Sequence, residues 1–380
     1  MSTSGRRASQ STATIPLLRP LLPTMEFLAP YLREIEQNRW YTNAGPLVAR
    51  FESRLAEHVR VRETGLAVMA NGTTALSTAL LAAGAKPGRT CLVPAWTFVA
   101  SAAAIWAANL IPHFVDVTPD SWIPDPRKLR ERSDLAEVGA VMIVGPFGTP
   151  VESAPWDAFS AETGIPVIVD GAACFDSIAS VPGARPGRSP IVISLHATKV
   201  LGVGEGGFIV STDDDVVRRS RQITNFGIGG SPRGEVLGYN GKMSEYHAAV
   251  GLAALDAWPA RRTALVSRTN RYVAELARVP NVRTSPSFGQ GWVSAYCTVR
   301  VPSDARTTVA RLSAMGVESR RWWHDGVHAQ PAYCGFPRDP LPATNDLAAH
   351  VLSLPFSHDM TDEQIARVVD CLERALVAPA

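Results

Sequence analysis

The sequence predicts an α/β fold, with a large domain built on a mostly parallel central sheet and a smaller α+β domain after it. Short apolar runs alternate with helical segments over residues 66–212, which is typical of a sheet whose strands are joined by helices. The 380 residues, 46% of them hydrophobic, are sufficient for both domains. We predict a disordered tail over residues 1–14, a large domain over 15–250 and a small domain over 251–380.

Seven apolar runs are the expected strands of the large domain. In chain order they are LAVMA from Leu66, TCLVP, IPHFVDV, VGAVMIV, IPVIVD, IVISL and FIVST ending at Thr212. Helices are expected from Thr73, through 100–108, and from Asp213 onwards. Ligands of such sheets collect at the carboxyl ends of the parallel strands, so polar residues that follow these runs are candidates for a functional site.

The remaining elements form a connecting helix and the small domain. Helical spacing from Lys242 to about Val279, broken at Pro259, predicts a long connection between the domains. WVSAYCTVRV then predicts a strand, RTTVARLSAMG a helix, and TDEQIARVVDCLERAL a final amphipathic helix. Thr361 and Gln364 have the spacing of a capping box at the start of that last helix.

Composition and charge exclude several classes of function. A formal net charge of +2 is too small to favour binding to nucleic acid or to an anionic membrane. The five cysteines include no C-x-x-C pair, so neither a disulfide framework nor a zinc site is predicted. The longest apolar stretch, over 99–112, is too short to span a bilayer, and residues 1–14 carry no hydrophobic signal segment. We expect a cytoplasmic protein without a metal, and with no nucleic-acid or membrane partner.

Gly202, Gly204 and Gly207 spell G-x-G-x-x-G, the fingerprint of a dinucleotide-binding turn. That fingerprint requires a helix directly after the glycines, whereas FIVST follows here and is expected to be a strand. The glycines are better explained as a tight connection between two strands. Lys199, just after the strand IVISL, is then the candidate for chemistry.

The sequence NGTTAL at residues 71–76 is a candidate anion site. It follows the first strand and starts a helix, so the first amides, with the hydroxyls of Thr73 and Thr74, can face a phosphate monoester. The alternative is a plain helix cap, which this segment taken alone favours.

Further candidates follow the later strands. Asp170 ends IPVIVD, where a poorly solvated carboxylate needs a cationic or hydrogen-bonding partner, unless it caps the next helix. Trp96 in VPAWTF is either a core aromatic or a flat face for a heteroaromatic ring. Ser194 lies five positions before Lys199, within reach of a second phosphate contact. As a set, these residues match what pyridoxal phosphate requires, because the cofactor needs an amine for its covalent link and a carboxylate at its pyridine nitrogen.

The order of the motifs resembles the DegT/DnrJ/EryC1/StrS family, the sugar aminotransferases of the pyridoxal-phosphate fold type I. The motifs that carry the resemblance are WYTNAGPLVARFE, NGTTAL, VPAWTF, VDVTPD, IPVIVDGAA, SLHATK, GEGG, GYNGKMSEYHAAVGL, LPFS and TDEQI. The resemblance runs from about Ile15 to the C-terminal segments and is most specific at K-x-x-x-x-G-E-G-G. It implies fold type I, with the cofactor bound by the large domain.

The resemblance also implies a role for each candidate residue. Lys199 would hold the cofactor covalently and carry the proton transfers, Asp170 would pair with the pyridine nitrogen, and Trp96 would stack on the ring. The cofactor phosphate would be bound by Gly72, Thr73, Thr74 and Ser194. Asn240 in GYNGKMSE would reach the phosphate in a second subunit, which implies a homodimer with shared active sites.

The chain departs from the common family pattern at two positions. Many members read D-A-A-Q where this chain has DGAA, so Ala173 lacks the glutamine amide that would bond the cofactor's phenolic oxygen. The hydrogen bond to the phenolic oxygen is then made by His196, by water or by no group. Lys242 replaces a common arginine and does not reproduce a guanidinium fork. His196, Lys242 and His328 are candidates for lining the substrate cleft, although a structural role is the stronger explanation for His328.

The resemblance implies an aminotransferase that moves an amino group from glutamate or glutamine to the keto carbon of a nucleotide-linked deoxysugar. A non-sugar carbonyl, such as a cyclitol or a secondary-metabolite intermediate, is the alternative substrate. Dehydration of a keto-deoxysugar is a further alternative, but relatives that perform it carry a histidine at the position of Lys199. A regulatory protein without turnover is the remaining one, disfavoured by the small net charge and the lack of a helix-turn-helix module.

Overall fold

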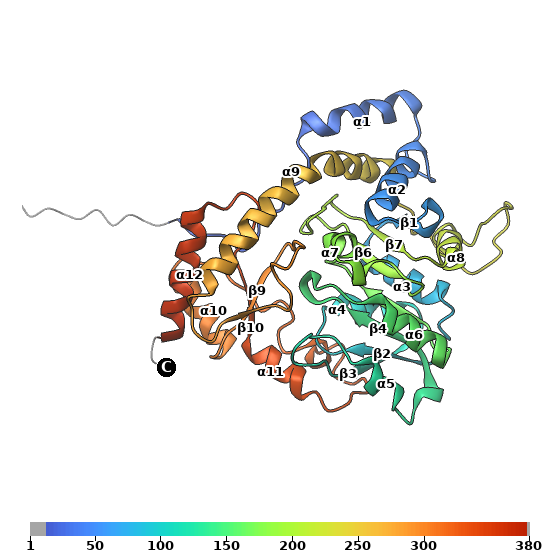
Figure 1. Ribbon diagram of the computed structural model, residues 1–380. Helices are drawn as coiled ribbons and strands as arrows, with labels where there is room; N and C mark the ends of the chain where they lie inside the picture. Colours follow the sequence, from blue (N-terminus) through green and yellow to red (C-terminus); the bar gives the residue numbers. More distant parts are fainter. Residues whose placement is uncertain (1–12, 378–380) are drawn as a thin grey trace, which may run out of the picture.

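The structure is a computed structural model that describes residues 13–377 (Figure 1). The disordered tail predicted over 1–14 therefore lies outside the described residues, except for Ala13 and Thr14. The described chain has a large α/β part around a central sheet and a smaller part next to the C-terminal half of helix α9 (Glu245–Leu276), which Figure 1 shows in gold. The predicted domain boundary at residue 250 stays a prediction.

The large part is built on a seven-stranded sheet in the order β1-β7-β6-β5-β4-β2-β3. Its strands are β1 (Leu66–Met69), β2 (Thr90–Pro94), β3 (Ile111–Val115), β4 (Val138–Val144), β5 (Val167–Asp170), β6 (Ile191–Ser194) and β7 (Gly207–Val210). The neighbours from β3 through β2, β4 and β5 to β6 run parallel, whereas β7 is antiparallel to both β6 and β1. Each strand overlaps one of the predicted apolar runs, so the mostly parallel sheet is confirmed.

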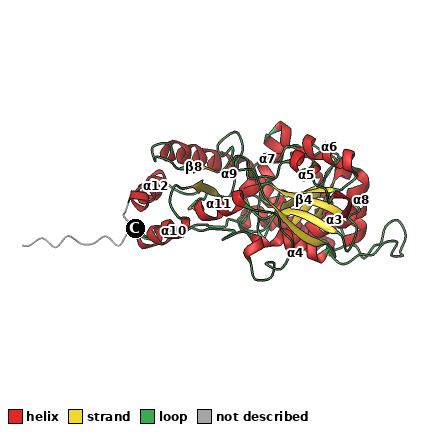
Figure 2. Cartoon of the chain, turned by 90° about the horizontal axis from the view of Figure 1, so that it is seen from below, coloured by secondary structure: helices red, strands yellow, loops and turns green. Residues whose placement is uncertain are grey.

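Helices cover both faces of this sheet (Figures 1 and 2). The α-helices that precede α9 are α1 (Met25–Asn38), α2 (Pro46–Val59), α3 (Gly72–Ala82), α4 (Val99–Ala107), α5 (Pro126–Arg130), α6 (Ser153–Thr163), α7 (Phe175–Ser180) and α8 (Asp214–Thr224). Successive residues of β4 alternate between two cores: Val141 and Ile143 pack with α2 and α6, and Ala140 and Met142 with α3 and α4. Burial on both faces explains why the strands are continuous apolar runs.

The loop between β6 and β7 contains Lys199 and the glycine pattern. The two strands pair antiparallel, with Ser194 opposite Gly207, so the pattern does not start a helix, as predicted. Gly204 has a φ of +95°, which side-chain-bearing residues rarely adopt, and a Cβ at Gly207 would lie 2.8 Å from the amide nitrogen of Gly72. The glycines thus allow a tight turn and a close approach of β7 to the start of α3.

The smaller part contains a three-stranded antiparallel sheet in the order β10-β9-β8, with helices packed around it. Its elements are β8 (Arg283–Thr284), β9 (Cys297–Arg300), α10 (Ala305–Ala314), α11 (Pro342–His350), β10 (Val351–Leu354) and α12 (Asp362–Val377). The predicted capping box is confirmed, because the amides of Thr361 and Gln364 donate reciprocally to each other's side chains at 3.0 and 3.2 Å. Ile15 pairs with Val317, so the first described segment also packs onto this part.

The predicted break at Pro259 is wrong, because α9 continues as one helix through the proline. A proline inside a helix removes one hydrogen bond and strains the preceding turn. Tertiary contacts hold both halves in line here. Before the proline, Asp256 accepts a hydrogen bond from Tyr31 of α1, and after it Arg268 pairs with α12. Although α9 is 32 residues long, neither it nor another helix within residues 13–377 is apolar enough to cross a membrane.

Candidate active site

Lys199 lies where the large and the smaller part of the molecule meet. Its Nζ donates a 3.1 Å hydrogen bond to the hydroxyl of Tyr296, a buried residue that directly precedes β9. The loop itself is fixed by its own backbone, since the amide of Lys199 donates to the carbonyl of His196 at 2.8 Å. The amine is therefore held by a contact that neither part could make alone.

Asp170 is buried at the end of β5. Its Oδ2 accepts a 2.6 Å hydrogen bond from the hydroxyl of Ser101 in α4, and its Oδ1 accepts one of 3.1 Å from the amide of Ala172. Burial raises the pKa of this carboxyl, and the two hydrogen bonds and the charge of Lys199 oppose the rise. Because α7 begins only at Phe175, Asp170 does not cap that helix. A buried carboxylate whose hydrogen-bond donors are neutral is suited to a cationic partner.

The start of α3 and Ser194 lie together. Asn71 caps the helix, with its Oδ1 accepting a 2.8 Å hydrogen bond from the amide of Thr74, so the plain helix cap is present. The amides of Gly72 and Thr73 are not used by this cap. A Cβ at Gly72 would lie 3.0 Å from the Cβ of Ser194 and 3.3 Å from its hydroxyl oxygen, so the glycine allows the serine to approach the helix start closely. An anion at this point would meet helix-start amides and hydroxyl groups.

An aromatic cluster, made of Trp96, Phe147, Tyr296, Trp322 and Trp323, extends from the end of β2 to the tyrosine that binds Lys199. Trp96 meets Trp323 edge to face at 5.0 Å, and Phe147 stacks on Trp323 at 4.2 Å. The ring nitrogens of Trp96 and Trp322 are buried and have no hydrogen-bond partner among the described residues. Leaving buried donors unpaired costs free energy, which a ligand with acceptor groups would recover.

His328 lies beside this cluster, in the short 3₁₀ helix η5 (Val327–Ala329). The amide of Val327 donates a 2.9 Å hydrogen bond to the carbonyl of Ala95, the neighbour of Trp96. Burial lowers the pKa of His328, so its imidazole is neutral at neutral pH. Its Nδ1 has no partner within the part of the chain that the structure describes. One ring nitrogen of His328 is thus unpaired within the described chain, and the role of this residue stays a prediction.

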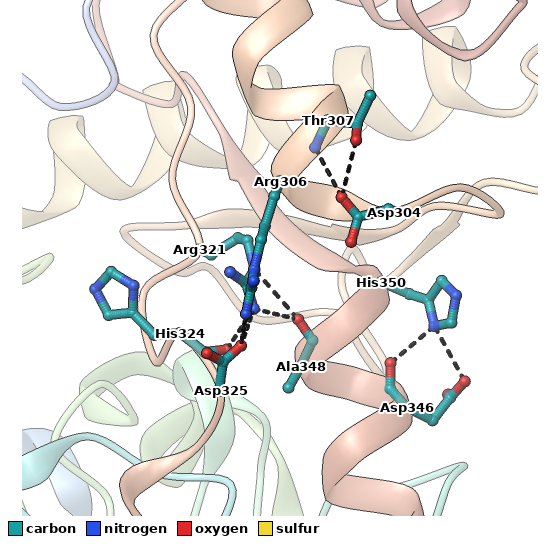
Figure 3. Close-up of polar contacts among 9 residues, drawn as sticks. All are labelled: Asp304, Arg306, Thr307, Arg321, His324, Asp325, Asp346, Ala348 and His350. Atoms are coloured by element: carbon teal, nitrogen blue, oxygen red, sulfur yellow. Dashed lines mark hydrogen bonds and ion pairs between the residues drawn. The ribbon is translucent and has the colours of Figure 1, made fainter. Parts of the chain in front are cut away.

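Arg321 fixes the segment that carries Trp323 (Figure 3). Its guanidinium donates to the carbonyl of Ala348 in α11 at 2.8 Å and to the carboxylate of Asp325 at 2.6 Å. Arg306 of α10 pairs with the same carboxylate, as the dashed lines in Figure 3 show. Two helices of the smaller part thereby position the aromatic side chains that face the large part.

The side chains of the other two substrate candidates, His196 and Lys242, contact different neighbours. The Nδ1 of His196 is 2.9 Å from the hydroxyl of Thr198, and its Nε2 is 3.8 Å from Glu205, with almost half of the imidazole exposed. The Nζ of Lys242 lies 4.6 Å from the centre of the Phe226 ring, and burial lowers its pKa. No hydrogen bond among the described residues joins either side chain to the Asp170 carboxylate or to the amine of the central lysine.

Asn240 is exposed at the end of the long loop after α8. The carbonyl of the next residue, Gly241, accepts a 2.8 Å hydrogen bond from the amide of Ala70, and a Cβ at Gly241 would lie 2.9 Å from Cγ2 of Thr74. Asn240 is therefore close to the start of α3 in its own chain, and its exposure leaves it accessible to a second subunit.

Sequence reasoning missed Ser101 and Tyr296. Ser101 stands in the alanine-rich VASAAAIWA, where a serine is indistinguishable from a small packing residue, and Tyr296 stands in an apolar strand run. The single available signal is that Thr97 and Ser101 are one helical turn apart, and their hydroxyls are 2.7 Å apart. Ala173, where the common glutamine is missing, packs against the aromatic cluster. Within residues 13–377, no group of three His, Cys, Asp or Glu side chains is arranged to hold a metal ion.

Comparisons with known proteins agree with this geometry. The profile of the DegT/DnrJ/EryC1/StrS aminotransferase family matches residues 24–373. GDP-perosamine synthase of Caulobacter vibrioides is 29% identical to this chain, over 94% of this chain and 99% of its own length.

Two solved structures are similar over nearly the whole chain. One is a Bacillus cereus protein assigned as a PLP-dependent aminotransferase, with a TM-score of 0.88 and 27% identity, covering 94% of this chain and 99% of its own. The other is DesI in the presence of its TDP-sugar product, with a TM-score of 0.84 and 32% identity, covering 96% and 94%. Family match and fold agree: the chain belongs to the DegT/DnrJ/EryC1/StrS family and is a pyridoxal-phosphate-dependent aminotransferase.

Proposed function

We propose that this enzyme transfers an amino group from glutamate or glutamine to the keto carbon of a nucleotide-linked deoxysugar. Two similar proteins, a GDP-perosamine synthase and a protein solved with a TDP-sugar product, support this substrate class. The observation that carries the proposal is the set of buried ring nitrogens without partners, at Trp96, Trp322 and His328. Aromatic faces pack on the C–H surface of a sugar, and polar atoms set among them bind its hydroxyl groups.

The residues around Lys199 fit the cofactor. The close approach of Ser194 to Gly72 at the start of α3 suits a phosphate group. The buried carboxyl of Asp170 suits a cationic pyridine nitrogen, which would offset the cost of its ionisation. Lys199 supplies the amine for the covalent link. When bound, pyridoxal phosphate supplies an electron-withdrawing ring that stabilises negative charge on the carbon next to the transferred nitrogen.

We assign the proton transfers to Lys199. In the first half-reaction its Nζ, released from the covalent link when the donor's amino group takes its place, would remove the proton from the α-carbon of the donor. In the second, it delivers a proton to the sugar carbon that receives the amino group. The hydrogen bond to Tyr296 orients the amine for both steps, and the buried Trp96 orients the cofactor ring.

The substrate class is tested with the holoenzyme and a panel of keto-deoxysugars linked to TDP or GDP. L-glutamate is expected to convert the cofactor to its amine form and remove the visible absorbance band, and one of the sugars should restore it after the donor is removed. The same sugars without the nucleotide are the control. Restoration by a cyclitol ketone and by none of the sugar nucleotides would refute the sugar assignment.

We also propose that the enzyme is a homodimer in which Asn240 binds the cofactor phosphate of the partner subunit. The exposure of Asn240 supports this arrangement, because it leaves the side chain accessible to a second subunit. Its place beside the start of α3 in its own chain makes contact with its own cofactor phosphate the alternative. The shared site would be completed across a two-fold axis, so that each subunit contributes to both sites.

Subunit mixing tests this proposal with two inactive variants, Lys199→Ala and Asn240→Asp, under conditions that allow exchange. The aspartate places a negative charge beside the phosphate and weakens cofactor binding. If Asn240 acts on the partner's cofactor, each heterodimer has one site with both changes and one with neither. Activity is then expected to return to about a quarter of the wild-type value. Absence of activity in a mixture whose subunits demonstrably exchange would show that Asn240 serves its own chain or no site.

A further inference from the structure

A cavity that is partly open to solvent lies against Lys199. It is bordered by the loop after β6, the middle of α9, the first described segment of the chain and the loop after β10. Its charged and titratable lining residues are Arg19, Lys199, Arg261 and His358. A carboxylate oxygen of Asp359 lies 3.1 Å from a guanidinium nitrogen of Arg19 and balances the charge of that side chain. The remaining charges make the cavity electropositive.

Arg261 is the unusual member of this set. It is only 9% exposed, and its guanidinium donates one hydrogen bond, of 3.2 Å, to the carbonyl of Val200. Among the described residues, no carboxylate lies within ion-pair distance, and burial lowers its pKa. The next residue, Arg262, differs because it pairs with Asp176 at 2.7 Å. Keeping a cation buried without an anion costs free energy, so the site requires an anion from outside the chain.

We propose that Arg261 binds a carboxylate of the amino-acid donor beside Lys199. A guanidinium presents two parallel N–H groups that match a carboxylate. Lys199 lines the cavity, so a donor held there lies beside this residue. The inference rests on the proposed function and adds the subsite that recognises the donor.

His358 does not add a second cation to the cavity. Burial lowers its pKa, and the charges of Arg261 and Arg19 lower it further against the effect of Asp359. The imidazole is thus neutral at neutral pH and is available as a hydrogen-bond partner rather than as a second cation. Arg261 is then the buried cation that a carboxylate would meet.

Calorimetric titration of the holoenzyme with glutarate tests the proposal, because this dicarboxylate has no amino group and cannot react. Arg261→Met is expected to raise the Kd at least about tenfold, equivalent to ~1.4 kcal/mol. Arg261→Lys keeps the charge but loses the paired N–H groups of the guanidinium, and should give an intermediate Kd. Arg271→Met is the matched control, since Arg271 lies on the same helix and pairs with Glu275 at 2.6 Å on the surface. An unchanged Kd in Arg261→Met overturns the proposal.

Thermal unfolding of the same variants separates binding from structure. Removing a buried cation without a carboxylate partner should leave the Tm of Arg261→Met unchanged or raise it. If Arg261 served only to anchor the Val200 carbonyl, the variant would lose stability and bind glutarate normally, which also overturns the proposal.

A parallel titration with inorganic phosphate identifies the anion. Phosphate binding that is tighter than glutarate binding, and that is lost in Arg261→Met, would assign the cavity to a phosphate group and contradict the donor subsite. Failure of the sugar panel together with Arg261-dependent glutarate binding would contradict the sugar substrate and leave the donor subsite supported. The experiments can therefore refute the sugar substrate or the donor subsite independently of each other.

Discussion

Lys199→Ala is expected to lower the rate of amino transfer by at least about a thousandfold, because the same Nζ links the cofactor and moves the proton. The visible absorbance band of the covalently held cofactor should disappear. Binding without the covalent link should persist, because the start of α3 and Ser194 remain in place. Borohydride reduction followed by peptide mass spectrometry checks the assignment, with the label expected on Lys199 in the wild type and on no lysine in the variant.

Two further variants separate chemistry from packing. Tyr296→Phe removes the 3.1 Å hydrogen bond to Lys199 but keeps the amine, so the label should remain and the rate should fall much less. Lys128→Ala removes an exposed lysine on α5 and should change neither the borohydride label nor the rate of amino transfer. A label on another lysine, or turnover of Lys199→Ala close to that of the wild type, would contradict the role assigned to this residue.

The sheet could be predicted from the sequence because both of its faces are buried. Successive residues of β4, such as Ala140 and Val141, pack into different cores, so the strand appears as an unbroken apolar run. The continuity of α9 through Pro259 could not be predicted in this way. A proline acts locally, whereas the hydrogen bond of Asp256 and the ion pair of Arg268 that hold the helix join segments far apart in the sequence.

The residues of the candidate site likewise fall into those that the sequence could predict and those that it could not. Asp170, Ser194 and Lys199 could be proposed because each lies at the end of a strand or shortly after it, and strand ends of a parallel sheet gather at one edge. Ser101 and Tyr296 could not be, because each reaches the site from an element whose sequence pattern reports only its own packing. Tertiary structure alone brings these hydroxyls to the carboxylate and the amine.

Asp170→Asn is expected to lower kcat by roughly a thousandfold, about 4 kcal/mol of transition-state stabilisation. An amide cannot keep the pyridine nitrogen protonated, so negative charge on the reacting carbon is less well stabilised. The fold should tolerate the change, because the hydroxyl of Ser101 can accept from the new NH₂ group and the amide of Ala172 can still donate. Steady-state kinetics with cofactor in excess gives the measurement, and turnover close to the wild-type value would refute the role of Asp170.

Asp176→Asn is the matched control, since Asp176 is also buried but pairs with Arg262 at 2.7 Å. Removing this ion pair leaves a guanidinium without its anion, so the variant should lose stability. Asp176 has no assigned role in the chemistry, so kcat per folded enzyme should change little. The two aspartates are expected to give opposite patterns of activity and stability.

The stability of the apoenzyme gives a second, pH-dependent test of Asp170. Its pKa is raised above the ordinary 3.8 in the folded chain, so the folded state binds the proton more tightly and ionisation destabilises it as pH rises. Asparagine does not ionise. The Tm of Asp170→Asn should therefore match that of the wild-type apoenzyme at low pH and exceed it increasingly until the pH passes the folded pKa. Adding pyridoxal phosphate should raise the Tm of the wild type more than that of the variant, because only an ionised Asp170 pairs with the cationic ring. A larger gain in the variant would mean that the carboxylate does not face the pyridine nitrogen.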